Sequence, residues 1–248
     1  MGSRVVSFDL WGTLITYGDR EAEAAWRIRE FGMILPQFGY QVPEEILREA
    51  VLGVRRRTLE HQRSTGRQAP VREQVAAMLA QLGVNDEEAL DVLVVAHTHA
   101  VLRADPQPYP YAREAVNAAK KMGHTLVLTS NTLATPASVT RTLLDYLDIE
   151  APFDAMFFSS ELGFAKPRPE VFAAVTEQLG VRPDEVVHIG NEWHSDVQGA
   201  LAAGWKAVWF NPTEKPACPG APAITSLADV EATVRALTRA EAAEDLPA

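Results

Sequence analysis

Hydrophobic residues recur at helical spacing through the part of the chain between residues 19 and 104. Within residues 21–35, apolar side chains return every three or four positions, and three later segments continue this pattern. The four predicted helices span residues 21–35, 43–57, 70–82 and 87–102. Since no segment here has the pattern of a strand, we predict that the helices bury their apolar faces against one another as a small bundle.

The pattern changes after residue 106, where short hydrophobic runs alternate with helical segments. Strands are predicted at residues 5–8, 125–129, 155–158, 186–189 and 207–210. Helices are predicted between and after them at 111–122, 135–147, 169–179, 195–203 and 227–237. This alternation predicts an α/β fold, a doubly wound, Rossmann-like parallel sheet with helices on both faces. We expect two domains: an α/β core of residues 1–17 and 106–248, and an inserted α-helical domain of residues 18–105.

Composition and charge narrow the choice of partners. The formal net charge of −10 argues against broad binding to nucleic acid or to an anionic membrane, because either would call for a basic face. No apolar run approaches the ~18 residues that a membrane span needs. The single cysteine, Cys218, cannot form an internal disulfide, so we expect a reducing, cytoplasmic setting. A homodimer stays open, and an anionic small molecule would have to be bound by a local group of donors.

Side chains suited to anion chemistry follow three of the predicted strands. Asp9 follows the first strand, and Ser130 and Asn131 follow the second. Asp196 comes shortly after the strand at 186–189, and Lys166 precedes a proline in a connecting loop. Each of these residues alone also has an ordinary structural role in a turn or at a helix start. Because the carboxyl ends of parallel strands line the ligand crevice, we expect the whole set to converge on Asp9.

These motifs, in this order, resemble those of the haloacid dehalogenase superfamily of hydrolases. The resemblance spans nearly the whole chain, from residues 9–14 through Ser130-Asn131 and Lys166 to residues 190–196. Residues 164–172 and 196–204 are similar to the phosphatase-rich branch, in which an α-helical cap follows the first motif. The resemblance implies that Asp9 is a nucleophile that forms a covalent aspartyl intermediate.

The resemblance also implies Mg²⁺ and a small anionic substrate, and it assigns roles to individual residues. The residues expected to act in catalysis are Asp9, Ser130, Lys166 and Asp196. Those expected to lie against the bound group are Trp11, Gly12, Ser130, Asn131 and Lys166. The metal or its water shell is assigned to Asp9, the backbone carbonyl of Trp11, Asn191 and Asp196. Phosphoryl transfer depends on such positioning and charge neutralisation.

Two positions depart from the phosphatase pattern. Trp11 stands where these phosphatases usually carry a second Asp that protonates the leaving alcohol, and loss of a general acid typically costs ~10²–10⁴-fold in rate. Asn191 stands where the fourth motif usually begins with an acidic metal ligand. A neutral amide can coordinate through its oxygen, but we expect Mg²⁺ to bind more weakly unless Glu192 compensates.

Trp11 keeps other functions open. The 2-haloacid dehalogenases also resemble this chain, since they have an aromatic residue at this position, and halide displacement needs neither a metal nor a proton for the leaving group. A weakly active or non-catalytic ligand-binding member is a further alternative. The predicted helical domain also contains clustered arginines, which either grip an anionic substrate or form a solvated helix face. They are Arg55, Arg56, Arg57, Arg63, Arg67 and Arg72.

Overall fold

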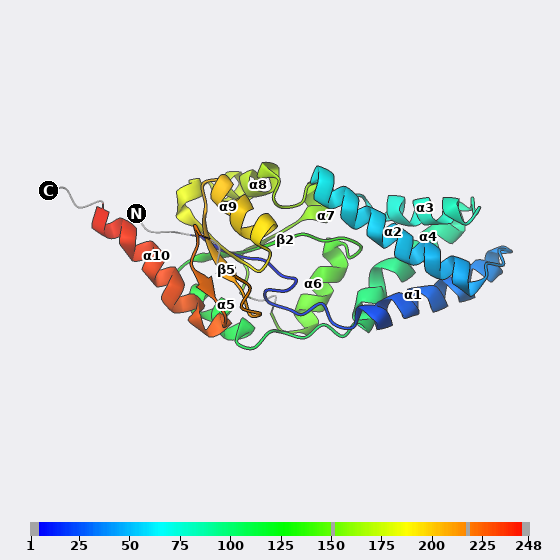
Figure 1. The fold of residues 1–248 in the computed structure, drawn as a ribbon, viewed down its shortest axis with the longest axis horizontal. Helices are drawn as coiled ribbons and strands as arrows, with labels where there is room; N and C mark the ends of the chain where they lie inside the picture. Colours follow the sequence, from blue (N-terminus) through cyan, green and yellow to red (C-terminus); the bar gives the residue numbers. More distant parts are fainter. Residues whose placement is uncertain (1–4, 150–151, 217–218, 245–248) are drawn as a thin grey trace.

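The computed structural model describes residues 5–149, 152–216 and 219–244, and Cys218 lies outside these ranges (Figure 1). Its sheet has six strands in the order β3-β2-β1-β4-β5-β6, and every neighbouring pair is parallel. The strands are β1 (Val5–Phe8), β2 (Thr125–Ser130), β3 (Ala155–Phe158), β4 (Val186–Gly190), β5 (Lys206–Phe210) and β6 (Ala223–Ile224). The predicted α/β fold is confirmed, and β1 lies in the middle of the sheet.

Helices cover both faces of this sheet, as Figure 1 shows. Helix α5 (Ala112–Lys121) precedes β2 in the chain. The helices that come after β2 are α6 (Ala137–Tyr146), α7 (Ser159–Leu162), α8 (Pro169–Leu179), α9 (Gly199–Ala202) and α10 (Val230–Glu244). Alternate strand residues face opposite layers: Val6 and Phe8 pack toward α5, α6 and α10, whereas Val5 packs toward α8 and α9. Because both faces are covered, β1 and β4 are buried throughout, and a polar group at their ends is held by a rigid support.

The remaining helices form a separate block with a core of its own. They are α1 (Arg20–Ile34), α2 (Glu44–Thr65), α3 (Val71–Gln81) and α4 (Glu87–His99), which we call the helical block. One large side chain from each helix lies in its core, namely Phe31, Leu47, Met78 and Leu93. In Figure 1 the helical block extends away from the sheet, beyond α6 and α7. Among the described residues, no helix is long and apolar enough to cross a membrane.

Three glutamines join the helical block to the core by bonding backbone carbonyls. Gln62 Nε2 donates to Thr132 O at 2.9 Å, and the amides of Gln68 and Gln74 donate to Leu133 O at 3.0 and 2.7 Å. The side chains of Gln68 and Gln74 are buried. These bonds hold the helical block against the loop that follows β2.

Helix boundaries differ from the expected ones at several places, and two of them concern residues that line the cavity described below. Helix α2 continues eight residues past position 57, where the apolar pattern fades, and it ends at Gly66, whose positive φ of 68° suits a helix C-cap. The segment Trp193–Gln198 is a π-helix followed by the short helix α9, where one regular helix was predicted. The wider turn of a π-helix changes where Asp196 points relative to β4.

Candidate active site

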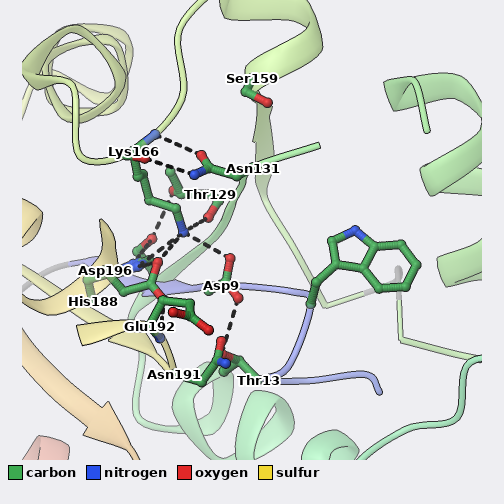
Figure 2. Close-up of polar contacts among 12 residues, drawn as sticks. Asp9, Thr13, Thr129, Asn131, Ser159, Lys166, His188, Asn191, Glu192 and Asp196 are labelled. Carbon is green, nitrogen blue, oxygen red and sulfur yellow. Dashed lines mark hydrogen bonds and ion pairs between the residues drawn. The ribbon is translucent and has the colours of Figure 1, made fainter. Parts of the chain in front are cut away.

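The carboxyl ends of β1, β2 and β4 bring three charged side chains together (Figure 2). Asp9 extends β1 by one residue, and its backbone N–H donates to Ile189 O of β4 at 2.8 Å. The ammonium of Lys166 lies 2.9 Å from Asp9 Oδ1 and 2.8 Å from Asp196 Oδ1. All three side chains are buried. One cation therefore links two carboxylates that are far apart in the sequence.

Lys166 is held at both ends. Asn131 binds its backbone: the Lys166 N–H donates to Asn131 Oδ1 at 2.7 Å, and Asn131 Nδ2 donates to Lys166 O at 2.9 Å. The ammonium also donates to Thr129 O at 2.5 Å. With its backbone and its side-chain end both bound to the end of β2, Lys166 has little freedom to leave the two carboxylates.

The pKa values of the two carboxyl groups in this site shift in opposite directions. Burial raises the pKa of Asp9 to about 7, because the pull of Lys166 is partly cancelled by the nearby negative charge of Asp196. Burial acts on Asp196 in the same way, but Lys166 and His188 outweigh it and lower the pKa of that carboxyl. Burial opposes the charge of Lys166, yet the two carboxylates raise its pKa. Asp196 thus stays ionised, and any added positive charge beside Asp9 would favour its ionised, nucleophilic form.

A buried polar layer lies beneath Lys166. His188 Nε2 is 3.4 Å from the ammonium and 3.5 Å from Asp196 Oδ1, and its Nδ1 is 2.9 Å from Ser7 Oγ. Ser7 Oγ is in turn 2.9 Å from Thr129 Oγ1. Burial and the charge of Lys166 lower the pKa of His188 to about 4. The ring is therefore neutral near pH 7 and acts as a polar support for the ion pairs.

Thr13 lies on the other side of Asp9. Its hydroxyl is 3.2 Å from Asp9 Oδ2 and 3.2 Å from Asn191 Oδ1. A hydroxyl has one proton, so it can donate to only one of these two oxygens at a time. The turn that brings Thr13 here needs Gly12, whose φ is 85° and whose position would place a Cβ 2.5 Å from Asn191 Nδ2.

Asp196 is fixed by the backbone around it as well as by Lys166. The Glu192 N–H donates to Asp196 Oδ2 at 2.8 Å. A Cβ at Gly190 would lie 2.4 Å from the Cβ and Cγ of Asp196. Asp196 can therefore pack on the end of β4 only because residue 190 has no side chain.

A cavity of about 420 Å³ opens above this cluster. Asp9, Lys166, Asp196, Trp11 and Asn131 line its core end, together with Glu192 and His194. Side chains of all four helices of the helical block and the loop of residues 133–135 line much of the rest, so the cavity lies between the helical block and the sheet. Trp11 is half-buried, and its ring stacks on Tyr17, with centroids 6.1 Å apart and an angle of 14° between the planes.

The structure brings most of the expected site residues together, with two differences in position. Asp9, Lys166 and Asp196 are in direct contact, and Trp11 and Asn131 face the cavity. Ser130 ends β2 with a buried hydroxyl that has no hydrogen-bond partner within the described ranges, and it is not among the residues that line the cavity. Gly12 and Asn191 pack on each other beside Thr13 and are also outside the lining.

Sequence reasoning missed Thr13 and His188 as members of the site. Thr13 stands inside the first motif, two residues after Trp11, and this position was the available signal. His188 lies in the predicted strand 186–189 at the register of Ser7, its β1 partner, but strand alternation does not say that the layer beneath Lys166 is polar. The arginines of the helical block divide: Arg55 and Arg63 line the cavity, whereas the other four of that group do not.

A family model described as a haloacid dehalogenase-like hydrolase matches residues 4–204 of this chain. The chain belongs to the haloacid dehalogenase-like hydrolases. The resemblance drawn from the motifs is confirmed, and the contacts among Asp9, Lys166 and Asp196 lie within the residues matched.

Relatives within the haloacid dehalogenase-like hydrolases include phosphatases. A glyceraldehyde 3-phosphate phosphatase from Methanopyrus kandleri is 30% identical over 131 residues, which are 53% of this chain and 55% of that protein. A phosphoglycolate phosphatase from Escherichia coli is 26% identical over 212 residues, 83% of this chain and 80% of that protein. The chain spans about half the length of the first curated relatives it matches.

A solved member of the family shares the fold over nearly the whole chain. The 2-haloacid dehalogenase from Pseudomonas syringae pv. Tomato DC3000 superposes with a TM-score of 0.72 and 22% identity, and the alignment covers 94% of this chain and 99% of that one. At this level of identity the likeness concerns architecture.

Proposed function

We propose that the protein hydrolyses a small phosphomonoester with the help of Mg²⁺, through a covalent aspartyl intermediate at Asp9. The observation that carries the proposal is the position of the Asp9 carboxylate, which faces a 420 Å³ cavity while the Lys166 ammonium holds it at 2.9 Å. A buried lysine beside a nucleophilic carboxylate can bind both that carboxylate and the group it attacks. The phosphatases among the relatives support this choice of substrate class.

In the proposed reaction, Asp9 attacks phosphorus and the bond from phosphorus to the ester oxygen breaks. The ester oxygen then leaves as an alkoxide that takes a proton from water, and a second water molecule attacks the aspartyl phosphate to release inorganic phosphate and restore Asp9. Lys166 neutralises charge on the transferred group, and Asn131 keeps Lys166 in place through its backbone. We propose that Ser130 and the loop at Gly12 also border the transferred group, and that Asp196 fixes the ammonium from its far side.

The oxygen atoms beside Asp9 are of the type that Mg²⁺ prefers. Asp9 Oδ2 and Asn191 Oδ1 share one hydroxyl proton from Thr13, which leaves one of them without that donor. Together with the Trp11 carbonyl, and with Asp196 through water, these atoms would hold the ion, which when bound supplies positive charge to the transferred group. Asn191 is a neutral amide and brings no negative charge to this group of oxygens, so we propose weak Mg²⁺ binding.

Because residue 11 is Trp, no carboxylic acid stands at this position to protonate the leaving group. The indole N–H is a hydrogen-bond donor only, and it is far too weak an acid to protonate a leaving group at neutral pH. We therefore propose that turnover is slow for esters of ordinary alcohols. Esters with better leaving groups, which depart without a proton, should be hydrolysed faster.

The second candidate function is hydrolytic dehalogenation of a 2-haloacid, and Trp11 is the observation that favours it. A halide ion needs no proton to leave, and an aromatic side chain in the cavity suits the apolar halogen atom of the bound substrate. In this scheme Asp9 attacks carbon, and water then hydrolyses the ester near Lys166 and Asp196. Mg²⁺ takes no part.

We also propose that the helical block acts as a cap of residues 18–105 over a core of residues 1–17 and 106–248. The cavity between them would admit substrate, and closure would remove water from around Asp9. The bonds from Gln62, Gln68 and Gln74 to the loop after β2 would form part of the closed arrangement.

One panel of assays tests both functions. Release of phosphate from p-nitrophenyl phosphate and of chloride from 2-chloropropionate would each be measured with and without Mg²⁺. The phosphatase proposal requires Mg²⁺-dependent phosphate release that Asp9→Asn abolishes. Chloride release that does not depend on Mg²⁺ would instead support the dehalogenase function and overturn the phosphatase proposal. A folded protein that releases neither product would contradict both schemes.

A further inference from the structure

The part of the cavity formed by the helical block contains a second group of polar side chains. Arg27 and Glu23 on α1, Arg55 on α2 and His97 on α4 all line it. None of these side chains touches Asp9, Lys166 or Asp196 by a hydrogen bond or ion pair in the described residues. This group therefore needs an explanation of its own.

His97 is the least satisfied member of this group. Its side chain is 3% exposed, and neither ring nitrogen has a hydrogen-bond partner within the part of the chain that the structure describes. Burial, with the charge of Arg27, lowers the pKa of His97 to about 3, so that the ring is neutral and offers one donor and one acceptor. Leaving such a group unpaired is unfavourable, and a ligand in the cavity would supply the missing partner.

Arg27 and Arg55 differ in how far their charges are already paired. Arg27 is buried, and its guanidinium lies 2.6 Å from Glu23 Oε1, while its Nε donates to the His97 carbonyl at 3.1 Å. Arg55 is half-buried and has no hydrogen bond or ion pair to any described residue. Its charge also contributes to the lowered pKa of Arg27, and both side chains line the same cavity. The Arg55 charge is thus left unpaired in a cavity that a neutral imidazole also lines.

The two ends of the cavity therefore differ in charge. The core end has Asp9, Asp196 and Glu192 against one lysine, and the helical-block end has Arg27 and Arg55 against Glu23. The exposed Arg20 and Arg63 add positive charge to the lining. An anionic group at the helical-block end would pair with a guanidinium without displacing an existing ion pair.

We propose that the helical-block end of the cavity binds a carboxylate of the substrate, through the Arg55 guanidinium and the ring of His97. This inference rests on the proposed function, and it narrows the substrate class to small phosphomonoesters that also carry a carboxylate. A carboxylate oxygen would pair with the Arg55 guanidinium, which has no partner among the described residues. Its second oxygen can accept the N–H of His97.

Binding of non-hydrolysable probes tests the subsite apart from turnover. Calorimetry would compare propylphosphonate with 3-phosphonopropionate, and butylphosphonate with 4-phosphonobutyrate, in the presence of Mg²⁺. In at least one pair we expect the carboxylate to tighten binding about tenfold, as one charge-assisted contact allows. Arg55→Met should remove this advantage and leave the alkylphosphonate unaffected. Arg56→Met is the matched control, because Arg56 is exposed on the same helix and does not line the cavity.

Glutarate separates failure of the subsite from failure of the proposed function. If phosphonates do not bind and no phosphate is released, but glutarate binds to the wild type and not to Arg55→Met, the subsite stands and the phosphatase proposal falls. Equal affinities within both phosphonate pairs would overturn the subsite. So would an undiminished carboxylate advantage in Arg55→Met, or failure of every carboxylate probe to bind the wild type.

Discussion

Replacing Trp11 by Asp should increase phosphatase activity. The backbone of residue 11 already stands two positions after Asp9, beside the cavity, so a carboxyl group there could reach a leaving oxygen. A positioned general acid contributes ~10²–10⁴-fold to such a reaction, and at about 1.36 kcal/mol per factor of ten this is roughly 3–5 kcal/mol off the barrier. The gain should appear only with Mg²⁺, since a further carboxylate beside Asp9 otherwise raises its pKa.

The substitution also removes favourable contacts, and these limit the expected gain. Trp11 stacks on Tyr17, and its backbone carbonyl accepts the Tyr17 hydroxyl at 3.1 Å. Loss of such stacking costs about 0.5–1.5 kcal/mol of folding stability. The hydrogen bond is made by the backbone and can survive the change of side chain. We therefore expect a folded variant with a slightly lower melting temperature.

The assay is the steady-state hydrolysis of an alkyl phosphate with a poor leaving group, measured with Mg²⁺ across pH 5–8. Trp11→Asn is the matched control, because Asn has the size of Asp and opens the cavity equally but cannot donate a carboxyl proton. If the introduced carboxyl group protonates the leaving oxygen, the Asp variant has a higher rate than the Asn variant. Equal rates in the two variants, or no gain in a folded Trp11→Asp protein, would refute it.

Three further predictions concern stability and the geometry of the site. Lys166→Met should lower the free energy of unfolding by about 3–5 kcal/mol, because it leaves two buried carboxylates without their cation; urea unfolding at pH 7 measures this, and a loss under 1 kcal/mol would contradict it. Gly190→Ala should displace Asp196 and reduce turnover at least tenfold, whereas Gly32→Ala, whose added methyl meets nothing closer than 3.7 Å, should leave turnover unchanged. His97→Gln should reduce the loss of stability at acidic pH. The unfolded chain protonates this histidine below about pH 6.5, whereas the folded chain does so only near pH 3. The stability of the wild type therefore falls as the pH is lowered between these values, by up to ~1.4 kcal/mol per pH unit. Urea unfolding of both proteins from pH 7.5 to 4.5 measures this, and equal pH dependence in the two proteins would contradict it.

Much of the core could be predicted from the sequence because the central strands β1 and β4 are buried on both faces. Such strands are short hydrophobic runs, and the polar residue that ends each run marks the edge of the sheet. Asp9 and Asp196 were found because they follow such runs, whereas Lys166 was found in a loop before a proline, and Lys166 meets both carboxylates in the structure. The topology then followed from general rules for parallel sheets, which place consecutive strand ends at one crevice.

Other parts of the site depend on packing that periodicity does not describe. The apolar pattern of α2 ends well before the helix does, because its last turns are held by polar contacts such as that of Gln62. The buried position of His97 next to a cavity depends on how α4 meets α1. A histidine near a helix end looks the same in the sequence when it faces solvent, as His99 does here.

The glutamine contacts between the helical block and the core have a consequence for how this protein can diversify. The side chains of Gln62, Gln68 and Gln74 donate hydrogen bonds to the main-chain oxygens of residues 132 and 133. Every amino acid provides such an oxygen. Attachment of the two parts is therefore insensitive to the identity of the side chains at those positions. Natural or engineered variation can remodel the inward-facing surface of α2 and α4 for new compounds while the docking geometry is inherited intact.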